Sequence, residues 1–129
     1  MKKILVVDDE DDILEYLTTL FRDNGYEAVS AHDGQEALEL MRKEKADLVT
    51  LDITMPEKSG VRFYREVKGD EALAKIPVII VTGVTGWGLD PEGFQKFISS
   101  RKQVPQPEGF MSKPVDRDKL LIMVKDLIS

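Results

Sequence analysis

The stretch Ile4-Leu5-Val6-Val7-Asp8-Asp9 decides the fold class of this chain. Four consecutive apolar residues are too few for a helix and show no alternation, so they indicate a strand buried on both faces. Similar runs occupy residues 48–51 and 78–81, and weaker strand signals occupy 27–31 and 110–112. Strands buried on both faces are typical of parallel sheets that helices cover on each side.

Helical patterns separate the predicted strands. Apolar residues recur at helical spacing between residues 13 and 21, and Asn24-Gly25 is a suitable end for that helix. Further helices are expected around residues 37–41 and 63–67, near 90–101, and over 120–128, the last with Asp116 as its N-cap. The alternation of five strands with five helices predicts an open, doubly wound α/β sheet that forms one domain over residues 1–129.

Composition excludes several classes of function. The 129 residues suffice for one domain with a proper core, and 24 acidic against 18 basic residues give a net charge of −6. This balance disfavours direct binding of nucleic acids or anionic membranes. Because the chain has no cysteine, disulfides, zinc-thiolate sites and thiol catalysis are excluded, and a cytoplasmic location is expected. No signal-peptide or membrane-spanning apolar segment occurs.

Polar residues follow the apolar strand runs in order. Asp8 and Asp9 come after the first run, Asp52 after the third, Thr82 after the fourth and Lys113 after the fifth. In doubly wound sheets the ligand crevice lies beyond the carboxyl ends of the strands. We therefore expect these five side chains to converge on one rim of the sheet.

This set of residue types favours phosphoryl chemistry with a divalent metal. Three carboxylates at low exposure repel one another, and carboxylate oxygens suit Mg²⁺. Mg²⁺ with Lys113 would neutralise phosphoryl oxygens, and Thr82 could donate a hydrogen bond to them. Asp52 is the best candidate for a nucleophile that forms an aspartyl phosphate, because it stands alone at the end of a central strand.

Together these motifs resemble the receiver domain of two-component response regulators over essentially the whole chain. The segments concerned are ILVVDDE at residues 4–10, LDITMP at 51–56 with Gly60 behind it, VTG at 81–83 and SKP at 112–114. The resemblance implies a flavodoxin-like sheet in the order 2-1-3-4-5. It also implies a signalling switch phosphorylated by a sensor histidine kinase or phosphotransfer protein, with output through protein–protein contacts. Such a protein is no enzyme beyond its own phosphorylation and autodephosphorylation.

The resemblance further assigns a role to each site residue. Asp52 would accept the phosphoryl group, and Asp8, Asp9, Asp52 and the backbone carbonyl of Thr54 would hold Mg²⁺. Lys113 would contact the phosphoryl group, and Thr82 would be the switch hydroxyl drawn toward it. Phe110, three residues before the lysine, stands at the position of the switch aromatic.

Two departures from the usual family pattern stand out. Thr54 and Val84 occupy the positions that modulate attack of water on the phosphoryl group. Since an apolar Val84 cannot orient water, we predict a phosphorylated state that is not especially short-lived. Lys113 follows Thr82 by 31 residues, more than is usual in the family, so the fourth-helix region is expected to be enlarged. Segment 83–109 is then either a flap or partner surface, or a tolerated loop insertion.

The sequence fits two other functions less well. A receiver-like domain that binds partners without phosphorylation is disfavoured because all five rim residues are present. A haloacid-dehalogenase-like phosphohydrolase would place its nucleophile motif first and its acidic pair last, whereas Asp8 and Asp9 open this chain. His32 is expected to be a surface residue beside the Asp33-Gly34 turn rather than a ligand.

Overall fold

The computed structural model describes residues 1–52, 59–82, 107–112 and 115–128, with the backbone alone at residues 59, 61, 82 and 112. Five parallel strands form one sheet in the order β2-β1-β3-β4-β5, which confirms the predicted fold class. The strands are β1 (Lys3–Val7), β2 (Glu27–Ala31), β3 (Leu48–Asp52), β4 (Val78–Thr82) and β5 (Gly109–Ser112).

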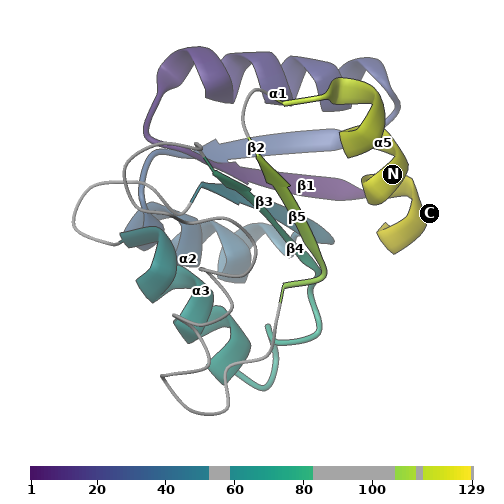
Figure 1. Ribbon diagram of the computed structural model, residues 1–129. Helices are drawn as coiled ribbons and strands as arrows, with labels where there is room; N and C mark the ends of the chain where they lie inside the picture. The colour runs from purple at the N-terminus through teal and green to yellow at the C-terminus, as the bar shows by residue number, and fades with distance from the viewer. Residues whose placement is uncertain (53–58, 83–106, 113–114, 129) are drawn as a thin grey trace.

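Helices cover both faces of the sheet (Figure 1). The described helices are α1 (Asp11–Asp23), α2 (Gly34–Glu44), α3 (Ser59–Gly69) and α5 (Arg117–Ile128). α1 and α5 lie on one face, and α2 and α3 lie on the other (Figure 1). The helix expected near residues 90–101, and with it the enlarged fourth-helix region, lies outside the described residues. In the part of the chain that is described, no helix has the length and apolar character needed to cross a membrane.

The core consists of two layers, one on each side of the sheet, because successive side chains of a strand point to opposite faces. Leu5, Val49 and Ile80 pack toward α2 and α3, where they meet the buried rings of Phe63 and Tyr64. The layer toward α1 and α5 contains Ile4, Val6, Leu14, Leu17, Phe21, Leu48, Ile79, Val81, Leu120 and Val124. β1, β3 and β4 are therefore buried on both sides, as their continuous apolar runs predict.

α1 ends at the Asn24-Gly25 pair, as predicted. Gly25 has a φ of +90°, a left-handed conformation that glycine adopts without steric cost. The N–H groups of Gly25 and Tyr26 donate to the carbonyls of Arg22 and Phe21, at 3.3 and 3.0 Å. This is the hydrogen-bond pattern of a Schellman C-cap, and it turns the chain directly into β2.

Aspartate side chains cap the starts of two other helices. Asp33 Oδ1 accepts the N–H of Glu36 at 2.8 Å at the start of α2. Asp116 Oδ1 accepts the N–H of Lys119 at 3.1 Å, which confirms Asp116 as the predicted N-cap of α5. Such caps satisfy backbone donors that the first turn of a helix leaves without a partner.

Candidate functional site

Three carboxylates meet at the carboxyl ends of β1 and β3. Asp8 and Asp9 directly follow β1, and Asp52 is the last residue of β3. The parallel register pairs Val7 with Leu51, so Asp8 and Asp52 leave the two strands at the same level. Each aspartate offers a carboxylate oxygen within 4.8 Å of those of the other two. The predicted convergence of these three side chains is therefore present in the structure.

The three carboxylates differ in their exposure to solvent. Asp8 and Asp52 are each only 2% exposed, whereas Asp9 is exposed. Backbone contacts hold Asp8 in place: its N–H donates to the carbonyl of Ala31 at 3.1 Å, and its Oδ1 accepts the N–H of Glu10 at 2.9 Å. Asp8 is thus tied to the end of β2 and to the residue before α1.

Like charges at this separation repel strongly where water is excluded. A hard divalent cation relieves that repulsion, and a set of carboxylate oxygens open to solvent on one side is typical of a Mg²⁺ site. The donor set of Asp8, Asp9 and Asp52 therefore fits Mg²⁺ in chemistry and in placement.

The other predicted site residues are only partly described. Thr82 is the last residue of β4, where β4 pairs with β3 on one side and β5 on the other, so its backbone ends at the same rim as Asp52. Lys113, Thr54 and Val84 lie outside the described residues.

Phe110 lies on β5 with its backbone paired to Ile80 of β4. It is partly buried and packs against the core layer on the α2 and α3 side. The ring is thus on β5, the strand whose last residue pairs with Thr82. This placement is compatible with the switch role that the resemblance implies.

His32 is a surface residue, as expected, and its side chain is 55% exposed. Its ring is held between Asp11 of α1 and Glu36 of α2, contacts that the sequence analysis did not predict. Lys68, which was not predicted as a notable residue, has an almost fully buried side chain. Lys68 lies four residues after Tyr64, on the buried stripe of α3. This spacing could have predicted from sequence that the lysine is buried.

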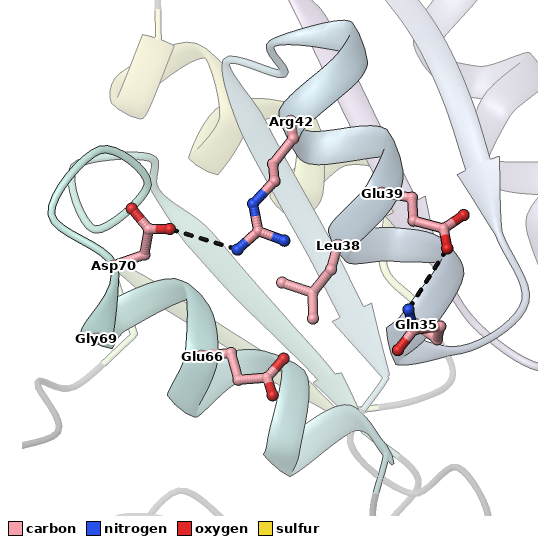
Figure 2. A pocket seen from close by; sticks show the side chains of 7 residues that line it. All are labelled: Gln35, Leu38, Glu39, Arg42, Glu66, Gly69 and Asp70. Atoms are coloured by element: carbon pink, nitrogen blue, oxygen red, sulfur yellow. Dashed lines mark hydrogen bonds and ion pairs between the residues drawn. The ribbon is translucent and has the colours of Figure 1, made fainter.

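A groove lies between α2 and α3 (Figure 2). Figure 2 shows Arg42 reaching across it toward Asp70, with 3.5 Å between the guanidinium and the carboxylate. None of the predicted site residues lines this groove, whose lining is Gln35, Leu38, Glu39, Arg42, Glu66, Gly69 and Asp70. The carboxylate cluster, not this groove, is the candidate site.

Comparison with known proteins gives a family that fits the five-stranded sheet and its cluster of three carboxylates. The family model of the response regulator receiver domain matches residues 4–125. The chain belongs to this family. Receiver domains are signalling domains that typically bind Mg²⁺ in an acidic pocket and interact with histidine kinases or phosphotransfer proteins.

Individual relatives and solved structures support the assignment of this receiver domain. It is 34% identical to Protein Rrf1 of Nitratidesulfovibrio vulgaris over 122 residues, which cover 95% of this chain and 79% of Rrf1. It is 33% identical to the polar-differentiation response regulator DivK of Brucella anthropi, covering 81% of this chain and 89% of DivK. The structure of the chemotaxis protein CheY4 of Vibrio cholerae is similar, with a TM-score of 0.82 at 28% identity over 98% of each chain.

Proposed function

We propose that this receiver domain, residues 1–129, is a cytoplasmic switch that accepts a phosphoryl group on Asp52 from a sensor histidine kinase or a phosphotransfer protein. The observation that carries the proposal is the cluster of Asp8, Asp9 and Asp52 at the rim of the sheet. Family membership supports the same function.

In the proposed reaction an oxygen of the Asp52 carboxylate attacks the phosphorus of a phosphohistidine. The new O–P bond makes an aspartyl phosphate, the P–N bond breaks, and the imidazole of the donor leaves. Asp52 is only 2% exposed, which limits the approach of water to its carboxylate.

Asp8, Asp9, Asp52 and the carbonyl of Thr54 would hold Mg²⁺, which neutralises charge on the phosphoryl oxygens when it is bound. The ammonium group of Lys113 would contact the same oxygens. Asp8 contributes through its rigid backbone contacts, which keep its carboxylate aimed at the rim.

The response to phosphorylation would run through Thr82 and Phe110. The added phosphoryl group carries about −1.5 to −2 charges, and Thr82 would be drawn toward it by a hydrogen bond. Phe110 would then turn inward and change the surface around β5 and α5 that a downstream protein contacts. A shift of this kind requires that the two states bind the partner with different affinity.

The test is intact-mass measurement after incubation with Mg²⁺ and acetyl phosphate. We expect the wild type to gain one phosphoryl group, the Asp52→Asn variant to gain none, and the matched variant Asp126→Asn on the exposed side of α5 to behave like the wild type. If a known receiver is phosphorylated under the same conditions and this chain is not, a phosphorylation-independent interaction domain becomes the better account.

The proposed lifetime of the phosphorylated state rests on Val84. An apolar side chain at this position gives an attacking water no hydrogen-bond partner, so the phosphorylated state is expected not to be especially short-lived. A time course of dephosphorylation should be faster in Val84→Glu than in the wild type. Equal rates would remove the modulating role of this position while leaving phosphorylation of Asp52 untouched.

A further inference from the structure

Lys68 and Glu108 form an ion pair between the end of α3 and the residue before β5, in which the lysine side chain is buried and the glutamate side chain is 33% exposed. The Lys68 ammonium donates to both oxygens of Glu108, at 2.8 and 2.9 Å, and its side chain is 1% exposed. The ammonium also lies 3.4 Å from the carbonyl oxygens of Ala74 and Ile76, and 5.9 Å from the ring centre of Tyr64. A charge this deeply buried is stable only while its partners remain in place.

Glu108 also starts the hydrogen-bonded pairing between β4 and β5. Its N–H donates to the carbonyl of Val78 at 3.1 Å, and its Oε1 accepts the N–H of Val78 at 2.8 Å. If the parallel ladder continued toward the N-terminus, the N–H of Val78 would donate to the backbone carbonyl two residues before Glu108 instead of to the Glu108 side chain. The carboxylate takes the place of that carbonyl, so the pairing begins at this residue.

Specific contacts are needed to fix the register in which β5 pairs with β4. The strand has four residues and lies at the edge of the sheet, where pairing is least constrained. Gly109 is a second feature that restricts the register. A Cβ at this position would come within 3.1 Å of Ile79 Cγ1 and 3.3 Å of Met123 Sδ. A slip by one residue would place the Cβ of Glu108 or Phe110 against these atoms.

We propose that Lys68 and Glu108 are positioning residues of the phosphoacceptor site. By fixing the register of β5, the ion pair keeps Phe110 on the α3 side of the sheet. It also sets where the backbone of Ser112 ends β5, at the rim and paired with Thr82 of β4. The part of this inference that concerns phosphorylation rests on the proposed function, whereas the part that concerns register does not.

Charge and geometry favour a positioning role over a purely stabilising one. Desolvation of the buried Lys68 ammonium offsets much of its attraction to Glu108, whereas loss of the carboxylate leaves that ammonium buried without its charged partner. Any other register would separate Glu108 from Lys68 and leave the lysine charge buried without its carboxylate. The pair therefore penalises wrong registers more than it stabilises the right one.

The first measurement is amide hydrogen exchange in Glu108→Gln, which keeps the size of the side chain and removes its charge. We expect the β5 amides to exchange at least tenfold faster than in the wild type, with β1 and β3 unchanged. Lys3→Met is the matched control, because it breaks the 3.0 Å ion pair that Lys3 of β1 forms with Glu44, and β3 and β4 separate β1 from β5. It should leave β5 exchange unaltered.

The second measurement is the rate of phosphorylation by acetyl phosphate. We expect the maximal rate to fall at least fivefold in Glu108→Gln, with half-saturation by acetyl phosphate unchanged, because the rim is misplaced rather than the donor excluded. Leu17→Ala opens a cavity in the α1 layer and reports the effect of lost stability alone. Lys68→Arg keeps the charge and should restore most of the rate relative to Lys68→Met.

The outcomes separate the two proposals. Unaltered β5 exchange in Glu108→Gln would overturn the register role. Faster exchange with an undiminished phosphorylation rate, or an equal loss of rate in Leu17→Ala, would overturn the positioning role. If the wild type itself accepts no phosphoryl group, the proposed function fails, and the exchange experiment still decides the register. Should Lys68→Met not fold, Glu108→Gln alone decides.

Discussion

His32 Nε2 lies 2.8 Å from Oδ1 of Asp11, which joins the residue after β2 to the first turn of α1. The other ring nitrogen lies 3.5 Å from Glu36 in the first turn of α2. The hydrogen bond to Asp11, with a smaller contribution from Glu36, raises the pKa of His32 above its ordinary value. The protonated imidazole therefore links the starts of two helices that pack on opposite faces of the sheet.

The stability that His32 contributes should depend on pH. Because its pKa is raised in the folded state, the contribution is fully present below about pH 6.5, the unfolded value, and is lost as pH rises through the folded value. Since the pair is exposed, we expect at most about 1 kcal/mol. Urea unfolding of the wild type and His32→Gln between pH 5.5 and pH 8.5 checks this. A difference that grows with pH would contradict it.

Mg²⁺ should stabilise the wild type through the three carboxylates. At a concentration about 100-fold above the dissociation constant, binding adds about 2.7 kcal/mol to the free energy of unfolding. Asp8→Asn should be more stable than the wild type without metal, since it removes one repelling charge and its Oδ1 can still accept the N–H of Glu10. It should lose most of the response to Mg²⁺. Thermal melts with and without Mg²⁺ measure the stability without metal and the stabilisation by Mg²⁺. As a control, Asp126→Asn should be stabilised by Mg²⁺ as much as the wild type.

Thr50 carries a buried hydroxyl that finds no hydrogen-bond partner in the described part of the chain. The residue lies in the middle of β3 and is 1% exposed. Thr50→Val replaces the hydroxyl with a methyl group of similar size, so we expect the free energy of unfolding to rise by about 1 kcal/mol. Chemical denaturation decides the matter; a loss of stability would mean that the hydroxyl has a partner in the folded protein.

Two glycines should respond to alanine in opposite directions. Gly109→Ala places a methyl group 3.1 Å from Ile79 Cγ1 and 3.3 Å from Met123 Sδ, closer than ordinary contact, which should cost about 1 kcal/mol. Gly69, the last residue of α3, has open space around its Cβ position, so Gly69→Ala should add about 0.4 to 1 kcal/mol. Chemical unfolding of both variants beside the wild type measures whether the free energy of unfolding falls in Gly109→Ala and rises in Gly69→Ala.

Much of the fold was predictable because it depends on local pattern. The apolar run at residues 4–7 indicated a strand buried on both faces, and β1 occupies Lys3–Val7. Asn24-Gly25 and Asp116 marked a helix end and a helix start where the structure has them. The convergence of Asp8 and Asp52 was predictable as well, since parallel strands place their carboxyl ends at the same rim.

Contacts between distant segments were not predictable in this way. Lys68 and Glu108 are 40 residues apart, and His32 and Asp11 are 21 apart. The sequence showed a lysine on the apolar stripe of α3, but many acidic residues could have been its partner.

By itself, the sequence determined the helices and strands, their order along the chain, and the rim of the sheet on which the acidic residues meet. Hydrophobic periodicity and the direction in which each strand runs are local properties of the chain. Tertiary structure alone decided which charges pair. A side chain's partner depends on how helices pack on the sheet, and that packing is set by the whole core at once.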